Sequence, residues 1–336
     1  MQLSDNKLKW QCSLIIPVYN ESKNILKCLK LISETYSKGV EVIIVNDGST
    51  DDTESLALEF IRDNKIDNVF YFKQENKGAA SARLYGIENS STDYIAFLDC
   101  DDSVEQDAIE RAMLKFSDGK EIDFVLFDYY SMSKNNSYDR FIYSIKNWPI
   151  TGLEAFSNTI EYWGIHAFGI YRKSTILAGY KLCSEIKICS EDSNNVNDDE
   201  LIARCAMLNS RFVALSDGKY LYSANDNSTT RRLNKNLFKM AYTTMSLREL
   251  ISNRDDLRFL ESPLNLYMLR VSTNLAIKNF KWKKQLSNKR QWVTAISMLV
   301  SHIQIKKLRV LLATRPVLLT WSMIKYICLW IVYSGR

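Results

Sequence analysis

The first 130 residues alternate short apolar runs with longer amphipathic segments, and this alternation limits the possible folds more than any other feature of the chain. Runs rich in β-branched residues predict buried strands, and apolar residues spaced three and four apart predict helices. The expected strands are Ser13–Val18, Glu41–Val45, Asn68–Phe72, Tyr94–Leu98 and Asp123–Tyr129, and the expected helices are Glu21–Tyr36, Asp51–Arg62, Gly78–Asn89 and Val104–Phe116. Alternation of this kind predicts a mostly parallel sheet with helices on both faces.

The rest of the chain does not continue this pattern. Residues 131–225 hold short aromatic-rich segments and a polar acidic stretch, Glu191–Glu200. From about Leu233 onward the periodicity is helical and no longer alternates with strands. We therefore expect two domains, an α/β catalytic domain over residues 1–230 and a basic helical region over residues 231–336.

The net charge of +5 hides a strong asymmetry along the chain. No Asp or Glu occurs from Ser262 to Arg336, whereas thirteen of the 44 basic residues lie there. This leaves 31 basic against 39 acidic residues before Ser262. A basic block of this kind is either a solvated face or the binding surface for a polyanion, of which nucleic acid and anionic lipid are the usual candidates.

The apolar end of the basic region favours lipid over nucleic acid. No nucleic-acid-binding motif is recognised, and aromatic residues beside an apolar stretch are typical of a membrane interface. Pro316–Tyr333 has about 18 residues, which is marginal for spanning a bilayer, and Lys325 interrupts it. We expect an in-plane amphipathic helix on an anionic membrane surface, and no nucleic-acid partner. The alternative is a basic helical subdomain packed on the catalytic core.

The numbers and spacing of cysteine and histidine indicate where the protein is found in the cell and limit the groups that could catalyse its reaction. The seven cysteines are odd in number and have no C-x-x-C spacing, which predicts neither a disulfide framework nor a zinc site. The polar N-terminus carries no apolar signal region, so we expect a cytoplasmic protein, peripheral on the inner face of the cell membrane. With only two histidines, His166 and His302, acid–base chemistry is expected to fall to carboxylates.

Polar clusters follow three of the expected strands, at Pro17–Glu21, Asn46–Asp51 and Asp99–Asp102. The carboxyl ends of parallel strands meet at one sheet edge, where ligands of such sheets bind. Carboxylates gathered there repel one another unless a cation lies among them, which favours a hard divalent metal with oxygen ligands. Asp99 and Asp101 form a D-x-D pair, and two carboxylates one residue apart can point the same way where the segment is extended. The alternative for each cluster is a set of turn formers and helix caps.

Four stretches carry a specific resemblance to a known family. SLIIPVYNES (13–22), EVIIVNDGSTDDT (41–53), NKGAASARLYG (76–86) and DYIAFLDCDD (93–102) resemble, in order and spacing, the family 2 glycosyltransferases of the GT-A fold. The resemblance implies a nucleotide-sugar donor, a UDP-sugar, and divalent Mn or Mg as cofactor. It implies that Asp47 reads the base, that Asp99 and Asp101 engage ribose and metal–diphosphate, and that Arg83 lies near base and diphosphate. The implied donor-binding residues are Pro17, Tyr19, Glu21, Asp47, Arg83, Asp99 and Asp101, with Asp101 and Asp99 as metal ligands. Arg83 could instead be a surface helix residue.

A later acidic segment also resembles the family. Asn197–Leu201 (NDDEL) is similar to the motif Glu-Asp followed by an apolar helix, so Asp199 takes the place of the catalytic base and Asp198 replaces the usual Glu. An inverting transfer needs one carboxylate to take the proton of the attacking acceptor hydroxyl, while a metal carries the charge growing on the leaving diphosphate. The alternative is that these acids only begin the helix Leu201–Leu208, since acids favour that end.

Two further segments match the family less closely. Residues 221–231 resemble its terminal motif, but Ser223 and Ala224 stand where an aromatic and a basic residue are usual, with Arg231 or Arg232 as substitutes. Trp163 and His166 lie where such enzymes shape the acceptor pocket, although we interpret both as core or rim residues.

Together these features predict an inverting hexosyl- or N-acetylhexosaminyl-transferase that acts on a glycan acceptor, lipid-linked, in bacterial surface polysaccharide (O-antigen, capsule or lipopolysaccharide) biosynthesis. The alternative is a catalytically inactive nucleotide- or glycan-binding protein on the same fold. A nucleotidyl-transferring enzyme or a dinucleotide oxidoreductase would carry a Gly-rich phosphate loop after the first strand, and Pro17–Asn20 is not one.

Overall fold

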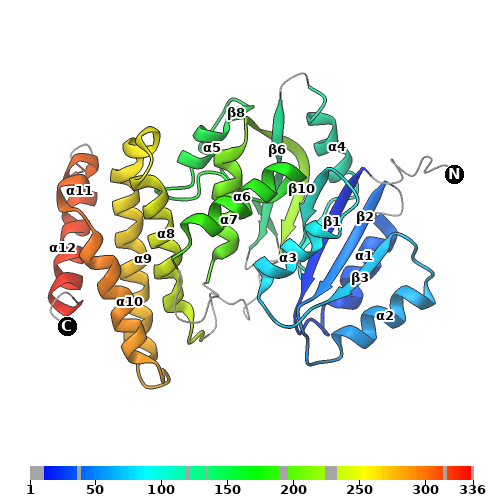
Figure 1. Cartoon of the computed structure of the whole chain (residues 1–336), viewed down its shortest axis with the longest axis horizontal. Helices are drawn as coiled ribbons and strands as arrows, with labels where there is room; N and C mark the ends of the chain where they lie inside the picture. Colours follow the sequence, from blue (N-terminus) through cyan, green and yellow to red (C-terminus); the bar gives the residue numbers. More distant parts are fainter. Residues whose placement is uncertain are drawn as a thin grey trace. The chain divides into compact units, whose positions relative to one another are not determined.

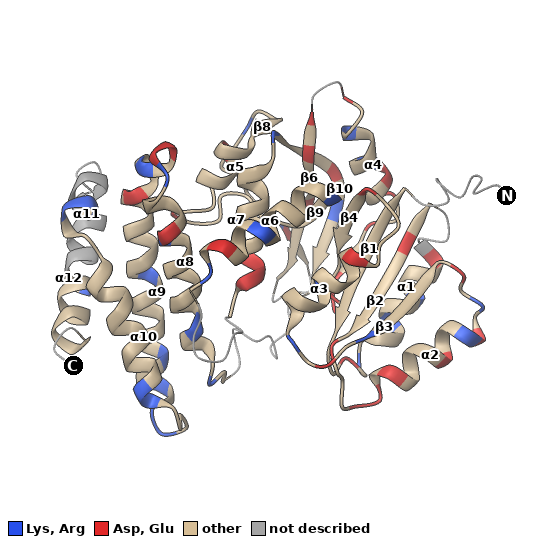
Figure 2. Cartoon of the chain, viewed as in Figure 1, with Lys and Arg blue, Asp and Glu red and all other residues tan. Residues whose placement is uncertain are grey.

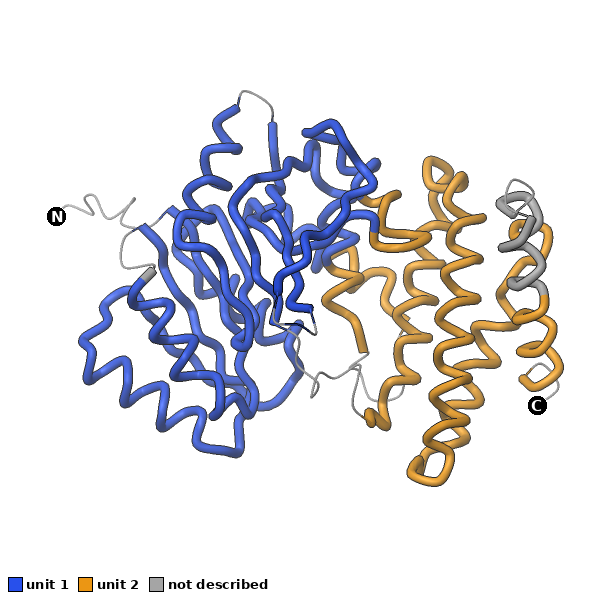
Figure 3. Tube along the Cα trace, turned by 180° about the vertical axis from the view of Figure 1, so that it is seen from behind, with its two compact units in different colours: residues 1–155, 164–180, 203–225 blue, residues 156–163, 181–202, 226–336 orange. Residues whose placement is uncertain are grey.

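The computed structural model describes residues 11–35, 39–118, 121–133, 135, 137–188, 196–223, 233–312 and 316–333, without the side chains of 35, 309–312 and 316–323. These residues form two compact units (Figure 3). Unit 1 comprises residues 1–155, 164–180 and 203–225, and unit 2 comprises residues 156–163, 181–202 and 226–336. Two segments from the middle of the chain therefore belong with the helical C-terminal region.

Unit 1 is built on a mixed sheet with the strand order β3-β2-β1-β4-β9-β6-β10-β5 (Figure 1). Its strands are β1 (Cys12–Val18), β2 (Val40–Asn46), β3 (Val69–Lys73), β4 (Tyr94–Phe97), β5 (Ser103–Val104), β6 (Ile122–Met132), β9 (Gly169–Arg172) and β10 (Phe212–Tyr222), with β7 (Tyr138–Arg140) and β8 (Ile150–Thr151) alongside. β1 pairs in parallel with both β2 and β4, and β2 with β3. The expected mostly parallel sheet is confirmed, and all five expected strands are present.

Two details of the sheet differ from the prediction. β9, a strand that the sequence analysis did not predict, lies antiparallel between β4 and β6. Val104, expected to begin a helix, instead belongs to β5, which pairs with the end of β10. A strand that closes an edge satisfies the backbone groups of β10, and this outweighs the helical spacing of Val104.

Helices cover both faces of this sheet. They are α1 (Ile25–Thr35), α2 (Thr53–Asp63), α3 (Ala79–Glu88), α4 (Ala108–Lys115), α5 (Gly152–Ser157), α6 (Lys173–Ile186) and α7 (Asp198–Asn209). α1, α2 and α4 bury their apolar residues in one core with Leu14 and Ile16 of β1. On the other face α3 approaches Ile15 so closely that a Cβ on Gly86 would lie 2.5 Å from its side chain. A glycine there allows close contact between helix and strand.

The helical part of unit 2 contains α8 (Met240–Ser252), α9 (Glu261–Trp282), α10 (Lys289–His302), α11 (Ile305–Leu312) and α12 (Pro316–Tyr333), with the short 3₁₀ turns η1 (Leu237–Lys239) and η2 (Asp255–Leu260). Within the described part of the chain, no helix is both long and apolar enough to cross a membrane.

The last helix packs on other helices of unit 2, which the expected in-plane amphipathic helix did not include, and its position on a membrane stays a prediction. α12 packs on α9 and α10 through Tyr326, Leu329 and Tyr333, which are buried. Its end is fixed by Ser297 Oγ, which donates to the Tyr333 carbonyl at 2.6 Å. Over residues 324–333, whose side chains are described, the opposite side of the helix is exposed and mostly apolar, with Lys325 as its one charged residue. Packing on neighbouring helices thus buries one apolar face and leaves another in solvent.

Candidate functional site

The three polar clusters meet at the carboxyl edge of the sheet, because β2, β1 and β4 are parallel neighbours. Hydrogen bonds join the first two clusters directly. The Asn20 amide donates to Ser49 Oγ at 3.0 Å, and the Thr50 amide donates to Asn20 Oδ1 at 2.8 Å. The Glu21 amide donates to Thr53 Oγ1 at 2.8 Å, at the start of α2. The turn after β1 and the turn after β2 therefore form one connected loop structure.

Asp47 connects this edge to the start of α3 through hydrogen bonds. Its carboxylate is 3% exposed and accepts hydrogen bonds from Gln74 Nε2 at 2.7 Å and from the amides of Lys77 and Gly78 at 2.9 and 2.8 Å. The neighbouring Gly48 has a φ of +73°, which the tight turn after Asp47 requires. Asp47 thus orders the loop between β3 and α3, and its contact with a nucleotide base stays a prediction.

Arg83 and Asp99, both predicted to bind the donor, form an ion pair. Arg83 Nη2 lies 2.7 Å from Asp99 Oδ1, and the guanidinium lies 5.8 Å from the centre of the Phe97 ring. The Arg83 side chain is only 13% exposed, so the interpretation as a surface helix residue is wrong. The pair links α3 to the segment after β4 and presents both charges at the same edge.

Glu21 shares this edge with several carboxylates. Burial raises the pKa of Glu21. The hydrogen bond donated by the side-chain amide of Asn24 lowers the pKa, and the charges of Asp101, Asp99 and Asp51 raise it further. The three clusters therefore act on one another electrostatically, as the sequence predicted. Of the remaining predicted residues, Pro17 is half-buried in β1, and Tyr19 is exposed just beyond it.

Asp102 is a residue of this edge that the sequence did not single out. It is buried and accepts hydrogen bonds from Tyr220 Oη at 2.7 Å and from the Ser223 amide at 2.8 Å. Burial, together with the charge of Asp99, raises the pKa of the Asp102 carboxyl to about 8. In the sequence, the only feature that pointed to Asp102 was its place as a third acid in the run Asp99–Asp102. Asp102 ties the D-x-D segment to the end of β10.

The residues of this edge fit a divalent cation. Among the described residues no three His, Cys, Asp or Glu side chains form a ready metal site. Mg²⁺ and similar ions bound with a substrate need only one or two carboxylates, because phosphate oxygens and water complete the shell. Burial raises the pKa of Glu21 and of Asp102, and the nearby charges of Asp99 and Asp101 raise both further, so negative charge gathers around these two aspartates. A cation held by these two aspartates would offset that charge.

A hollow of about 270 Å³ lies against the D-x-D segment, between it and α1. It is lined by Asp101, Asp102 and Ser103 on one side and by Asn24 and Lys27 on the other, among others. The edge that carries the predicted metal ligands therefore adjoins open space.

Comparison with known proteins identifies the domain that this edge belongs to. Residues 13–176 match the family model Glycosyl transferase family 2. The chain carries a family 2 glycosyltransferase domain. GlyA of Streptococcus pneumoniae is 27% identical over 312 residues, which cover 85% of this chain and 42% of GlyA. GgaB of Bacillus subtilis, a minor teichoic acid biosynthesis protein, is 25% identical over 291 residues, which cover 84% of this chain and 30% of GgaB.

A solved structure matches nearly the whole chain. S. aureus TarS in complex with UDP-GlcNAc has a TM-score of 0.66 at 19% identity, over 95% of this chain and 89% of that one. This likeness confirms the predicted GT-A fold followed by a helical C-terminal region. The chain spans less than half the length of GlyA and of GgaB.

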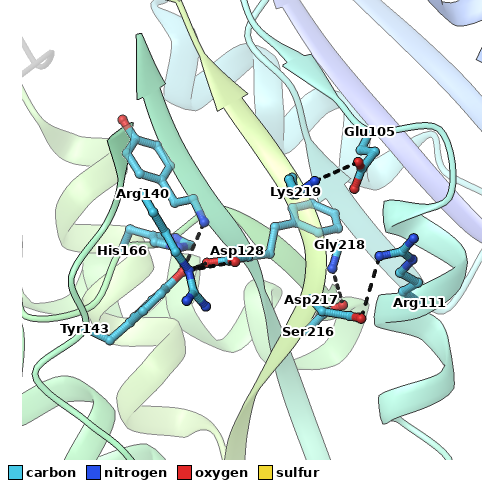
Figure 4. A network of polar contacts seen from close by, with 12 residues as sticks. Glu105, Arg111, Asp128, Arg140, Tyr143, His166, Ser216, Asp217, Gly218 and Lys219 are labelled. Atoms are coloured by element: carbon cyan, nitrogen blue, oxygen red, sulfur yellow. Dashed lines mark hydrogen bonds and ion pairs between the residues drawn. The ribbon is translucent and has the colours of Figure 1, made fainter. Parts of the chain in front are cut away.

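His166 of the glycosyltransferase domain is a core residue, as the sequence interpretation had it (Figure 4). Its Nδ1 accepts from the Phe168 amide at 3.1 Å, so Nε2 carries the hydrogen and donates to Tyr143 Oη at 2.7 Å. Burial lowers its pKa to about 3, which keeps the ring neutral. Half-buried Trp163 belongs to unit 2.

Asp199 lies in the first turn of α7 and is exposed. The helix begins at Asp198, three residues earlier than predicted, so all three acids of the motif belong to its first turn. The N-terminus of a helix stabilises such charges, as the alternative interpretation held, and this is compatible with a catalytic role. Asp199 as the base stays a prediction. Ala224, Arg231 and Arg232 of the terminal motif lie outside the described residues.

We predict that Asp102 makes the cation-free protein less stable as pH rises. Its folded pKa of about 8 exceeds the ordinary 3.8, so between these values the folded state keeps a proton that the unfolded state has released. From pH 5 to pH 8 the free energy of unfolding should fall by about 2–4 kcal/mol more in the wild type than in Asp102→Asn. Urea denaturation at both pH values measures this.

Asp67→Asn is the matched control, because Asp67 is an exposed aspartate. It should show the wild-type pH dependence. If Asp102→Asn shows it as well, the carboxyl of Asp102 does not titrate as described.

Proposed function

We propose that the chain transfers a sugar from a UDP-sugar to a glycan acceptor with inversion at the anomeric carbon, using Mn²⁺ or Mg²⁺. The observation that carries this proposal is the juxtaposition of Arg83 and Asp99 with Asp101 and Glu21 at the carboxyl edge of a family 2 glycosyltransferase sheet. The UDP-GlcNAc bound to TarS supports a UDP-sugar donor. The relation to GgaB supports an acceptor in bacterial surface-polysaccharide assembly, which we propose is lipid-linked.

The proposed mechanism divides the work between two sets of residues. Asp99 and Asp101 would hold the cation, which when bound offsets charge on the leaving diphosphate. Arg83 holds Asp99 in place and adds a positive charge to the same edge. Asp199 takes the proton of the acceptor hydroxyl as its oxygen attacks the anomeric carbon. An oxocarbenium-like transition state is further stabilised by nearby carboxylates.

The second candidate is an inactive nucleotide- or glycan-binding protein on the same fold. The presence of Asp47, Asp99, Asp101 and Asp199 together favours the enzyme over this candidate. Metal-dependent release of UDP from UDP-sugars without any acceptor distinguishes the two, because a binding protein releases none.

We predict that nucleotide binding depends on a divalent cation through the D-x-D carboxylates. Asp101→Ala should abolish turnover and most of the gain in UDP affinity that Mn²⁺ gives, while its thermal unfolding stays close to the wild type. Calorimetric titration of UDP with Mn²⁺ and with excess chelator measures this, with Asp67→Ala as the control. Full activity of the wild type in excess chelator would refute the role of the metal.

We predict that Asp199 is the base. Asp199→Asn keeps the size and hydrogen bonding of the side chain but removes the proton acceptor, so turnover should fall by roughly 10²–10⁴-fold. UDP affinity should barely change, since the base serves the acceptor. Near-normal turnover would place the base elsewhere, with Asp198 the next residue to test.

We also propose that α12 attaches the enzyme to an anionic membrane surface at the inner face of the cell membrane. The outward side of α12 exposes Ile324, Ile327, Trp330, Ile331 and Val332. Exposed basic residues surround the turn between α9 and α10 (Figure 2): Lys281, Lys283, Lys284, Lys289 and Arg290. With no acid after Glu261, this region complements anionic lipid, where each basic residue adds about 1 kcal/mol.

We predict that Ile327→Asp/Ile331→Asp abolishes flotation of the protein with vesicles that contain anionic lipid. The matched control is Leu58→Asp/Leu114→Asp, which makes the same change at exposed apolar positions of unit 1. The control and the wild type should float with anionic vesicles and much less with neutral ones. If neither vesicle carries the wild type, the membrane proposal is wrong. If the wild type is a dimer that the α12 variant converts to a monomer, a second copy rather than lipid covers this face.

A further inference from the structure

Two hydroxyl groups of α8 bond to the backbone on either side of the segment that leads into α7. Ser246 Oγ accepts from the Ile188 amide at 2.8 Å, and it donates to the Tyr242 carbonyl at 3.0 Å. Thr243 Oγ1 donates to the Val196 carbonyl at 2.8 Å. Both α8 side chains are buried. A buried hydroxyl costs free energy unless it is hydrogen-bonded, so these bonds fix residues 188 and 196 against α8.

These two bonds bring an ion pair together beside the predicted base. Lys187 precedes Ile188, and Asp198 follows Val196 by two residues. Lys187 Nζ lies 2.7 Å from Asp198 Oδ2, and the Asp198 side chain is only 11% exposed. A buried carboxylate needs such a partner, because leaving it unpaired is strongly unfavourable. The pair therefore holds the first residue of α7 to the chain that α8 has fixed.

The first turn of α7 has further restraints of its own. Asn197 adopts a φ of +67°, and its Nδ2 donates to Glu200 Oε1 at 3.0 Å. The Leu201 amide donates to the Asn197 carbonyl at 3.3 Å. Asp199 lies between these anchored residues. The backbone of Asp199, and with it the direction of its Cα–Cβ bond, is thus set by a turn that is held from both sides.

We propose that Thr243 and Ser246 of α8, with Lys187, are positioning residues that hold Asp199 in the orientation it needs to take the acceptor's proton. All of these residues belong to unit 2 (Figure 3). The helical C-terminal region is then part of the catalytic machinery in addition to carrying the proposed site of membrane attachment. This inference rests on the proposed role of Asp199. A small displacement of a catalytic group lowers kcat without changing the affinity for the donor, so the inference can be tested by comparing kcat with KM.

The chain offers matched variants for the test. Thr243→Val/Ser246→Ala removes the two bonds. The control is Thr244→Val/Ser272→Ala, which removes two equally buried hydroxyls whose bonds stay within their own helices. Both pairs make the same chemical change, so a general loss of stability affects them alike.

Hydrogen–deuterium exchange of the full chain measures, without any ligand, how firmly α8 holds the first turn of α7. Thr243→Val/Ser246→Ala should speed exchange in peptides covering residues 196–203 by roughly tenfold, since two hydrogen bonds that order this turn are lost. The control should leave these peptides unchanged. Unchanged exchange in the test variant, or an equal increase in the control, overturns the inference.

Kinetics separates positioning from mere folding. With UDP-GlcNAc and Mn²⁺ as probe, kcat for UDP release should fall roughly tenfold in the test variant while KM stays near the wild type, and Thr243→Ser should restore the Thr243 contribution. Asp199→Asn is measured in parallel. If Asp199→Asn lowers turnover but the test variant does not, α8 is no positioning element. If Asp199→Asn itself keeps normal turnover, the proposed base is wrong, and the exchange result still decides whether α8 anchors α7.

Discussion

The parallel pairing of β1 with β2 on one side and β4 on the other brings together residues that the chain spreads over almost ninety positions. In this register Val18 lies beside Asn46, and Ile15 beside Phe97, so the turns that follow the three strands end at one edge. A shift of any of these strands would separate Asp47, Asp99 and Glu21, because each follows its strand by only one to three residues. Charge then accumulates at the edge, and Arg83 reaches it from α3 to pair with Asp99.

The strands, and the meeting of the three polar clusters at one edge of the sheet, could be predicted because their signals are local. A β-branched run followed by a polar turn identifies both the strand and the end at which its functional residues lie. The features that could not be predicted depend on partners far away in the chain. Asp102 is tied to Tyr220, 118 residues later, and nothing in the run Asp99–Asp102 indicates that its third acid becomes buried. β9 is only four residues long, and its position between β4 and β6 follows from tertiary pairing alone.

The acidic motif at the start of α7 could likewise be predicted only in part from the sequence. The sequence identified Asp199 by resemblance and left open whether the acids merely begin a helix. They do begin a helix, and the two interpretations are compatible. What the sequence could not indicate is that Thr243 and Ser246, 47 and 58 residues from their backbone partners, hold Val196 and Ile188 against α8. Such buried hydroxyls in a helix have no sequence signature that separates them from hydroxyls bonded within their own helix, such as Thr244.

The central claim is that the carboxyl edge of the sheet binds a UDP-sugar together with a divalent cation. A crystal structure of the chain with UDP-GlcNAc and Mn²⁺, collected at a wavelength where manganese scatters anomalously, tests it most directly. We expect one anomalous peak that contacts the Asp101 or Asp99 carboxylate and the diphosphate, with the uracil near Asp47. A nucleotide bound at another edge of the sheet, or bound at this edge with no manganese peak beside the two aspartates, would contradict it.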